Sequence, residues 1–399
     1  MAEMMKGNEA IAEAAVRAGA RFYAGYPITP SSEIMEYLSW RMEEVGGAFV
    51  QAESELAGIN MVIGAAACGV RALTASSGPG ISLKQEGIST LCDEGLSAVV
   101  ITQVRYGNGL GTLFTSQCDY NRETRGGGQG DYRCIVLCPS SIQEYVDLML
   151  PAYELAEKYR IVVVMMGEGT LGQMMEPVTL PDFVETKRTP WALNGHYTYK
   201  KIGIFERDSM KEAVELREKY AAIQENEQRW QEESIEDADY VFVAYGVPGR
   251  ATLGAVRELR AAGEKVGLIR PITAWPYPEK AFARINPNVK GIITVEENAT
   301  GQMIDDAALA IKKTHKDRNI PAYAARGTVT TPANINKLKG YIKNALQAQM
   351  NHEGYSIVEV LSPCPINWGL SPVKAMERIE KELIPYYPIG EFKKRGENQ

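Results

Sequence analysis

Histidine is scarce in this sequence, which contains only His196, His315 and His352. None of them lies in the first 170 residues, so that part of the chain cannot build a Ser/His/Asp or Cys/His nucleophile system. Zinc and iron–sulfur centres are built from clustered cysteines, typically with C-x-x-C spacing. The six cysteines show no such spacing: Cys68, Cys92, Cys118, Cys134, Cys138 and Cys364. If the function needs iron–sulfur or zinc chemistry, we expect it on another chain.

Long apolar runs and basic clusters are also absent. No stretch is long enough to span a bilayer. Residues 1–22 predict an amphipathic helix without the basic start, apolar run and cleavage site of a signal peptide. The net charge is −7, and no aromatic and basic stripe indicates a nucleic-acid surface. We therefore expect a cytoplasmic protein that binds neither membrane nor nucleic acid.

The composition is that of a globular protein: 399 residues, of which 45% are hydrophobic and 23% charged. This length suffices for two or three domains. Along the first 170 residues, short β-rich runs alternate with longer helical patterns, which is typical of βαβ units. The predicted strands are RFYAGYP, AFVQA, VRALTAS, SAVVIT, CIVLC and IVVVMM. The sequence therefore predicts an α/β fold with a mostly parallel sheet flanked by helices.

A second α/β segment begins at DADYVFVAYG, close to residue 238, and a third segment begins at about residue 318. Before it, residues 207–233 predict one charged helix that faces solvent. Residues 104–131 form a Gly-rich stretch without periodicity. Because long structureless loops in compact domains are usually functional, we expect this loop to serve the site.

Two motifs point to one site. GYPITPSSE, at residues 25–33, predicts a strand end and a helix start, with Thr29 as the cap and Pro30 at the first helical position. AESELAG, at residues 52–58, puts Glu55 on the first turn of the next helix. Open α/β sheets bind ligands at the carboxyl ends of their strands, so we expect both motifs at one crevice.

Glu55 has two interpretations. As a first-turn acid it can simply complement the helix dipole. The helix that follows, however, is almost wholly apolar and rich in small residues, so its N-terminus is expected to be buried. A buried carboxylate is costly unless it hydrogen-bonds a partner, and a ligand nitrogen is such a partner. Glu53, two residues earlier, is the competing acid.

The loop SSGPGIS, at residues 76–82, opens a helix, and its backbone N–H groups can approach a ligand closely. An ordinary structural turn explains the same residues equally well. Arg105 ends a predicted strand, where it is either a surface residue or a fork for a carboxylate. Tyr120, Arg122 and Arg125 are expected to face solvent on the long loop.

At these motifs the chain resembles the α subunit of the 2-oxoacid:ferredoxin oxidoreductases, thiamine-diphosphate enzymes that oxidise and decarboxylate 2-oxoacids to acyl-CoA. The resemblance covers nearly the whole chain in ordered blocks, among them KGNEAIAEAAVRAGARFYAGYPITPSSEIMEYL, QAESELAGINMVIGAAACG, SSGPGISLKQEGIS, GGGQGDYRCIVLCPSS, KVGLIRPITAWPYPE and VEENATGQM. It is nearest to the branched-chain (2-oxoisovalerate) and 2-oxoglutarate types.

The resemblance implies a pyrimidine-binding domain at 1–235 and a transketolase-C-like domain at 236–315. The segment 316–399 resembles the tail of the family's β subunit, which binds the diphosphate, but it lacks that subunit's G-D-G metal motif. We therefore expect a docking or structural extension there.

Family roles carry over residue by residue. Glu55 would hydrogen-bond the aminopyrimidine nitrogen of thiamine diphosphate, Thr29 would contact the substrate carboxylate or keto oxygen, and Arg105 would anchor the carboxylate. The remaining residues implied to bind the cofactor are Tyr26, Pro27, Ile28, Ser77 and Gly78.

The resemblance also implies a multi-subunit enzyme. The thiamine diphosphate would be shared with the β subunit, and Mg²⁺ and [4Fe-4S] clusters would lie on partner subunits, with no metal on this chain. Further partners would be a γ subunit, a ferredoxin-like δ subunit and ferredoxin itself. Coenzyme A is the implied co-substrate, beside a small 2-oxoacid.

One loop departs from the family pattern. Where close relatives carry RGGPGLG, residues 105–111 are RYGNGLG. An aryl 2-oxoacid of the phenylglyoxylate or indolepyruvate type is therefore an alternative substrate, favoured if Tyr106, Phe114 and Tyr120 line the pocket. A non-catalytic structural subunit is the other alternative, which the intact Thr29, Glu55 and Arg105 disfavour.

Overall fold

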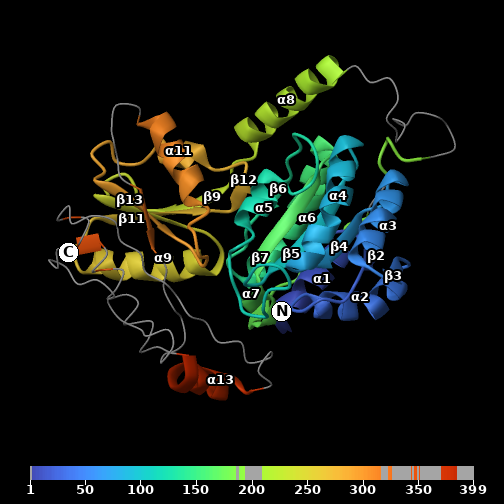
Figure 1. Cartoon of the computed structure of the whole chain (residues 1–399), viewed down its shortest axis with the longest axis horizontal. Coiled ribbons are helices and arrows are strands. Elements are labelled where there is room, and N and C mark those ends of the chain that lie inside the picture. Colours follow the sequence, from blue (N-terminus) through green and yellow to red (C-terminus); the bar gives the residue numbers. More distant parts are fainter. Residues whose placement is uncertain are drawn as a thin grey trace. The chain divides into compact units, whose positions relative to one another are not determined.

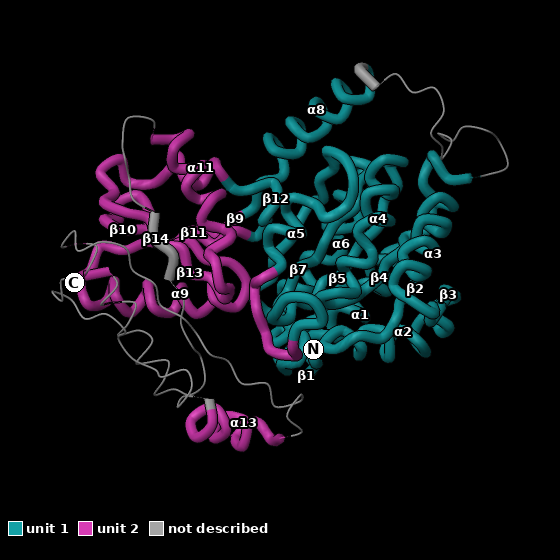
Figure 2. The backbone as a smooth tube through the Cα atoms, in the orientation of Figure 1, with its two compact units in different colours: residues 1–111, 119–229, 272–278 teal, residues 112–118, 230–271, 279–399 magenta. Residues whose placement is uncertain are grey.

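The computed structural model describes residues 2–185, 188–193, 209–315, 322–325, 343, 346, 347, 350 and 370–383. Two compact units divide the chain (Figure 2). Unit 1 comprises residues 1–111, 119–229 and 272–278, and unit 2 comprises residues 112–118, 230–271 and 279–399. Most of the expected extension at 316–399 lies outside the described residues.

Unit 1 contains a seven-stranded sheet in the order β12-β6-β7-β5-β4-β2-β3. All neighbours are parallel except β12, which pairs antiparallel with β6. The strands are β2 (Phe22–Gly25), β3 (Ala48–Gln51), β4 (Ala72–Ser76), β5 (Ala98–Val104), β6 (Ile135–Leu137), β7 (Val162–Glu168) and β12 (Thr273–Trp275). Every residue of β4, β5, β6 and β7 is buried, which explains their continuous apolar runs. The predicted α/β fold and all six predicted strands are confirmed.

Helices cover both faces of the sheet of unit 1 (Figure 1). The helices of unit 1 are α1 (Gly7–Arg17), α2 (Ser32–Glu44), α3 (Glu55–Ala67), α4 (Pro79–Asp93), α5 (Tyr120–Arg125), α6 (Ile142–Tyr159), α7 (Gly169–Gln173) and α8 (Ser209–Asn226). α1 contacts both α2 and α6, whereas α3 packs on α4. The chain steps from β2 to β3 in one direction and from β3 to β4 in the other, so right-handed crossovers place α2 and α3 on opposite faces. This reversal at β2 creates the kind of crevice in which open α/β sheets bind ligands.

Three local predictions were wrong, each because a distant partner decides the structure. Residues 3–6 begin no helix but form β1 (Glu3–Lys6), which pairs antiparallel with β8 (Met175–Val178). The charged helix predicted to end at residue 233 stops at Asn226, and β9 (Trp230–Glu233) follows and pairs with a strand of unit 2. The long loop contains helix α5, and its residues 112–118 belong to unit 2.

Unit 2 contains a five-stranded sheet in the order β14-β13-β10-β11-β9, parallel except for β9. Its further strands and helices are β10 (Tyr240–Ala244), β11 (Val266–Pro271), β13 (Gly291–Val295), β14 (Ala322–Ala325), α9 (Gly246–Ala261), α10 (Glu279–Phe282), α11 (Ile304–Thr314) and α13 (Pro372–Arg378), which continues into a π-helical turn (Ile379–Leu383). Its core packs Phe242, Val256, Leu268 and Ile293. In the described ranges, none of the helices combines the length and apolar character needed to cross a bilayer.

Candidate functional site

The candidate site lies in unit 1, at the carboxyl ends of β2, β4 and β5. β2 leads into the YPITP turn (residues 26–30), and β4 leads into the serine-glycine loop (SSGPGIS, residues 76–82). Arg105 directly follows β5. α3, which starts with Glu55, packs against both β2 and β4. The reversal of strand order at β2 thus brings both sequence motifs to one edge of the sheet, as predicted.

The YPITP turn ends later than the sequence suggested. α2 begins at Ser32, so the expectation that Thr29 caps the helix and Pro30 opens it was wrong. The Ile28 carbonyl accepts hydrogen bonds from the Ser31 N–H (2.9 Å) and the Ser31 hydroxyl (2.8 Å), which close a separate turn before the helix. The Thr29–Pro30 peptide is cis.

A buried amide network that the sequence did not reveal holds this turn. The Pro30 carbonyl accepts hydrogen bonds from Asn8 Nδ2 (2.7 Å) and Gln173 Nε2 (3.2 Å). Asn8 is fully buried, and its Oδ1 accepts from Gln103 Nε2 (2.9 Å). Gln103 Oε1 in turn accepts from the Tyr145 hydroxyl (3.0 Å). These contacts fix the backbone of the turn at the edge of the site.

Glu55 is the first residue of α3, and its side chain is buried with 6% exposure. Ser54 caps the helix, accepting from the Ala57 N–H at 3.2 Å, so Glu55 is not needed as the cap. The Glu55 carboxylate forms no hydrogen bond with the described part of the chain. Glu53, by contrast, is exposed. Burial without a partner is the condition under which a ligand donor is expected.

Two buried serines without hydrogen-bond partners in the described ranges precede α4, and one of them lies beside this carboxylate. Ser76 and Ser77 are fully buried, and neither hydroxyl has a hydrogen-bond partner among the described residues. A Cβ built on Gly80 would meet Ser76 Oγ and stand 2.5 Å from Glu55 Oε1. The carboxylate and the Ser76 hydroxyl therefore converge on the start of α4, where only glycine fits.

Lys84, which the sequence did not single out, is fully buried on α4. Its Nζ donates to the Glu55 carbonyl at 3.3 Å. Burial lowers the pKa of Lys84 to about 8, and the negative charge of Glu55 opposes that shift. A lysine within a helical pattern is usually solvated, so nothing in the local sequence predicted its burial.

Arg105 lies where the sequence placed it, beside Thr29 and Gly78, with 8% exposure. Its Nη1 donates to the Thr29 carbonyl (2.7 Å) and its Nη2 to the Leu110 carbonyl (2.5 Å). Burial lowers the pKa of the guanidinium, and the charges of Asp119 and Glu55 oppose this shift. The side chain therefore ties the turn to residues 106–111, while Thr29 Oγ1 forms no hydrogen bond with the described residues.

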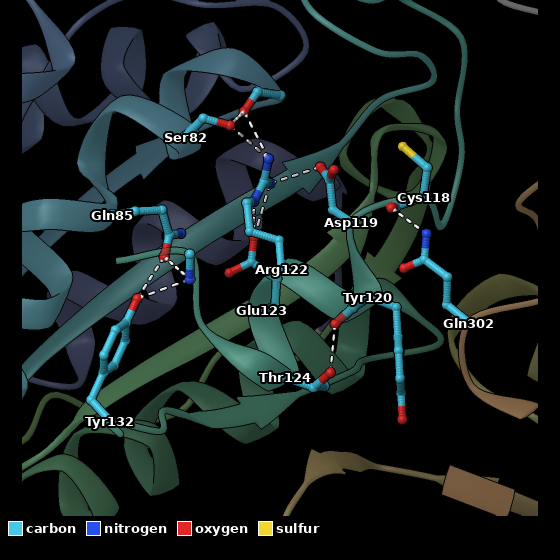
Figure 3. Close-up of polar contacts among 12 residues, drawn as sticks. Ser82, Gln85, Cys118, Asp119, Tyr120, Arg122, Glu123, Thr124, Tyr132 and Gln302 are labelled. Carbon is cyan, nitrogen blue, oxygen red and sulfur yellow. Dashed lines mark hydrogen bonds and ion pairs between the residues drawn. The ribbon is translucent and has the colours of Figure 1, made fainter. Parts of the chain in front are cut away.

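The prediction that Arg122 faces solvent was wrong, because hydrogen bonds hold its side chain over the serine-glycine loop (Figure 3). Its Nη1 donates to the Gly78 carbonyl (3.0 Å) and to Ser82 Oγ (3.3 Å). Its Nη2 donates to Asp119 (2.8 Å) and Glu123 (2.9 Å), and its Nε donates to Glu123 (3.1 Å). All five N–H groups are thus engaged, and burial raises the pKa of the Glu123 carboxyl.

The other two residues predicted to decorate the loop differ from each other. Tyr120 is fully buried, so the prediction was wrong for it, whereas Arg125 is exposed as predicted. Because it has no exposed surface, Tyr120 does not line an open pocket. Phe114 belongs to unit 2, whereas Tyr106 and Tyr120 belong to unit 1. In the described ranges, no group of three or more His, Cys, Asp or Glu side chains is arranged to hold a metal ion.

Within unit 2, residues 112–118 of the long loop are bound to the loop after β13. Gln117 donates its N–H to the Glu297 carbonyl (2.6 Å), and its Oε1 accepts the Glu297 N–H (2.9 Å). Gln302 Nε2 donates to the Cys118 carbonyl at 2.7 Å (Figure 3). Hydrogen bonds of Gln117 and Cys118 therefore hold part of the stretch that looked structureless in the sequence.

Comparisons with known proteins give the class that this fold and site define. Residues 13–239 match the family described as pyruvate flavodoxin/ferredoxin oxidoreductase, thiamine diP-bdg. Residues 238–335 match pyruvate:ferredoxin oxidoreductase core domain II. The chain belongs to this family of 2-oxoacid:ferredoxin oxidoreductases, which confirms the resemblance inferred from its motifs.

Among its relatives is the ketoisovalerate oxidoreductase subunit VorB of Methanothermobacter marburgensis, 48% identical over 315 residues, covering 77% of this chain and 89% of the relative. The 2-oxoglutarate synthase subunit KorA of Methanocaldococcus jannaschii is 36% identical over 342 residues, covering 78% and 92%. The 2-oxoglutarate:ferredoxin oxidoreductase of Magnetococcus marinus has the same fold, with a TM-score of 0.75 and 24% identity. That match covers 86% of this chain and 65% of the solved chain.

The residues of the site fit the aminopyrimidine end of thiamine diphosphate. This end carries a ring nitrogen and an amino group, and so needs a carboxylate and hydrogen-bonding hydroxyls. The Glu55 carboxylate and the Ser76 hydroxyl lie together at the start of α4, and they and the Ser77 hydroxyl have no hydrogen-bond partner among the described residues. Nothing comparable suits the diphosphate end in the described ranges, where no metal-binding group of acids was found.

Proposed function

We propose that this chain is the subunit of a 2-oxoacid:ferredoxin oxidoreductase that binds the aminopyrimidine end of thiamine diphosphate. The complete enzyme oxidatively decarboxylates a 2-oxoacid to acyl-CoA and passes the electrons to ferredoxin. The observation that carries the proposal is the buried Glu55 side chain, whose carboxylate has no hydrogen-bond partner in the described residues and lies against Gly80 and Ser76. A non-catalytic subunit would have no use for such a costly group.

Thiamine diphosphate, when bound, supplies a carbon nucleophile for the keto group of the substrate. Glu55 holds the proton shared with the pyrimidine ring nitrogen, and its largely buried side chain lies on the first turn of α3. Ser76 and Ser77 offer hydroxyls to the neighbouring amino group. The other proposed cofactor contacts are Tyr26, Pro27, Ile28 and the backbone of Gly78.

The substrate carboxylate is proposed to bind between Thr29 and Arg105. The Thr29 hydroxyl forms no hydrogen bond with the described residues, and Arg105 is held next to it through the Thr29 carbonyl. A bidentate contact requires two parallel N–H groups, and the Arg105 guanidinium carries five, of which the bonds to the Thr29 and Leu110 carbonyls use two.

The proposed substrate is a branched aliphatic 2-oxoacid with a single carboxylate. The relative at 48% identity is named for ketoisovalerate. Of the two arginines that touch the Gly78 segment, Arg122 already has all five N–H groups engaged, which leaves Arg105 for a substrate carboxylate. 2-Oxoglutarate, the substrate in the name of the relative at 36% identity, would need a second cation for its second carboxylate.

The complex is proposed to work in the cytoplasm with a β subunit that binds the diphosphate and Mg²⁺, and with γ and ferredoxin-like δ subunits that carry the clusters. We propose that residues 1–235 are the pyrimidine-binding domain, 236–315 the transketolase-C-like domain, and 316–399 a docking extension. The exposed side chains of Leu56 on α3 and Leu83 on α4 lie beside the site, where a partner subunit would cover them.

The test is a substrate screen with the complex assembled from this chain and its partner subunits under anaerobic conditions. CoA-dependent ferredoxin reduction is measured with 2-oxoisovalerate, 2-oxoglutarate, pyruvate, phenylglyoxylate and indolepyruvate. We expect kcat/KM for 2-oxoisovalerate to exceed that for 2-oxoglutarate by at least about tenfold. A preference for an aryl acid would support the alternative substrate, and no reduction with any 2-oxoacid would refute the proposed function.

A further inference from the structure

Lys84 is a fully buried, ionisable side chain to which the proposed chemistry assigns no task. It lies on the second turn of α4, and its Nζ sits where that helix meets α3 and the end of β2. A Cβ built on Gly58 would stand 3.4 Å from Lys84 Nζ and 3.2 Å from Gly25 Cα. The ammonium group is therefore enclosed next to both sequence motifs. It lies near Gly25, the residue before Tyr26, and it contacts the Glu55 carbonyl.

Fold stability does not explain a lysine here. Removing an ammonium group from water is costly unless it is paired and hydrogen-bonded. Lys84 has three N–H groups and forms one hydrogen bond with the described residues, the 3.3 Å bond to the Glu55 carbonyl. Burial lowers its pKa to about 8 from 10.5, so the folded state is penalised for keeping the proton. An unbranched apolar side chain would fill the same space without this cost.

We propose that Lys84 is a positioning residue for Glu55. Its ammonium group holds the first turn of α3 through the Glu55 carbonyl and places a positive charge behind the Glu55 carboxylate. Together these contacts keep the Glu55 carboxyl group aimed at the aminopyrimidine ring nitrogen, with which it shares a proton. The inference rests on the proposed function, because it assigns Lys84 a task in the same site.

The charges that face Lys84 come from few elements. α3 contributes Glu55, β2 contributes Gly25 with no charge, and on α4 itself Glu86 is exposed. Arg105 follows β5 and interacts with Glu55, so the carboxylate lies between two cations. Above a pH of about 8, Lys84 loses its proton and only Arg105 remains charged beside Glu55. Cofactor affinity and turnover should therefore fall along an alkaline limb near that pH.

The experiment uses the assembled complex and compares Lys84→Met with Lys84→Gln, which keeps an N–H donor for the Glu55 carbonyl but no charge. The dissociation constant of thiamine diphosphate, kcat from pH 6 to pH 10 and the thermal midpoint are measured for each. We expect both variants to lose about tenfold or more in cofactor affinity and in kcat at neutral pH, the scale on which outer partners of site residues act. The alkaline limb should disappear, and the thermal midpoint should stay or rise. Lys211→Met, which removes an exposed lysine of α8, is the control.

A double-mutant cycle locates the effect. If Lys84 acts through Glu55, the double variant Glu55→Gln/Lys84→Met should have a kcat less than about threefold below that of Glu55→Gln alone. A lower thermal midpoint with kcat per assembled complex and the alkaline limb both retained would show a purely structural lysine and overturn the inference. Wild-type behaviour of Lys84→Gln would overturn the role of the charge, and it decides the matter if Lys84→Met does not fold. Failure of the wild-type complex to bind thiamine diphosphate would instead refute the proposed function.

Discussion

Glu55 is the residue to which we assign the proton transfer of the proposed site. Glu55→Gln keeps the size and burial of the side chain but removes its ability to hold a proton. We expect kcat of the assembled complex to fall at least about a hundredfold, the usual scale of general acid–base assistance. The measurement is steady-state ferredoxin reduction, with size-exclusion chromatography to verify assembly.

The chain supplies a matched control for this variant two residues away. Glu53 is exposed, so Glu53→Gln removes the same charge from the same segment without touching the buried position. We expect it to retain turnover within about twofold, because surface substitutions have small effects. Normal turnover in Glu55→Gln together with a large loss in Glu53→Gln would show that Glu53 is the catalytic acid.

Arg105 ties the Thr29 turn to the loop and is proposed to bind the substrate carboxylate, so its replacement should reveal both roles. Arg105→Lys keeps the charge but not the planar fork, so it cannot reproduce a bidentate contact with a carboxylate. We expect 2-oxoacid binding to weaken by about 1.5–3 kcal/mol, the range for hydrogen bonds to charged groups, with thiamine diphosphate affinity unchanged. Since a lysine also cannot bond the Thr29 and Leu110 carbonyls together, proteolysis within residues 106–111 should become faster.

Both effects are measured on the same preparation, by the apparent substrate constant and by limited proteolysis. Arg125→Lys, on the exposed side of α5, is the control for the loop. Faster proteolysis with an unaltered substrate constant would leave Arg105 as a structural residue and remove it from the site.

At the residue scale, the sequence predicted the residues that belong to local motifs, and it missed polar residues that tertiary packing buries. Glu55, Thr29 and Arg105 were predicted as site residues because each stands at the end of a predicted strand or the start of a predicted helix. Lys84 and Asn8 were missed because a charged or amide side chain in a helical pattern looks solvated until tertiary packing encloses it.

At the scale of elements, a buried acid joins the first two helices of unit 1. Glu13 on α1 accepts hydrogen bonds from Arg17 Nε (2.8 Å), from Arg41 Nε (2.8 Å) and Nη2 (3.0 Å), and from the Tyr37 hydroxyl (3.1 Å). Burial alone would raise the pKa of Glu13, but the bonds from Arg41 and Arg17 outweigh it and hold the pKa below the usual 4.5. The ionised carboxylate is therefore part of the folded state.

A depressed pKa stabilises the fold above the ordinary value, and this stabilisation is lost as the pH falls through the folded-state pKa. We expect Glu13→Gln to lower the free energy of unfolding by about 1–3 kcal/mol at pH 7, because it leaves buried donors without an acceptor. Urea denaturation should show the same deficit at pH 5.5 and a smaller one below pH 4.5. Glu36→Gln, an exposed acid of α2, is the control; a deficit independent of pH would contradict the assignment.

The elements that the sequence predicted and those it missed differ in the range of their contacts. The strands β4, β5 and β7 were predicted because their own residues are continuously apolar. β1 and β12 were missed because each is short and becomes a strand only by pairing with residues far along the chain, β8 and β6. The same holds for residues 112–118, whose hydrogen bonds to the loop after β13 no local pattern encodes.

At the scale of the whole molecule, the proposed site suits only one end of thiamine diphosphate. Unit 1 offers a buried carboxylate and two hydroxyls without partners among the described residues, which suit a neutral aminopyrimidine. The diphosphate end is highly charged and binds through a cation, for which the described residues contain no cluster of acids. Of the cysteines, Cys92, Cys134 and Cys138 are buried, Cys118 is half-buried and Cys68 is exposed.

The isolated chain should therefore be colourless and a poor binder of thiamine diphosphate. In the complex, thiamine diphosphate is held at its aminopyrimidine end by this chain and at its diphosphate end by the partner subunit. Because the isolated chain lacks the second contact, we expect its affinity for thiamine diphosphate to be at least about a hundredfold below that of the complex. Titration calorimetry with thiamine diphosphate and Mg²⁺, together with iron analysis and a visible spectrum, tests this against the reconstituted complex. A brown preparation of this chain alone, or tight cofactor binding by it, would mean that it carries a cluster or a diphosphate site of its own. Because Cys364 and most of the segment 316–399 lie outside the described residues, such a result would direct the search to that segment.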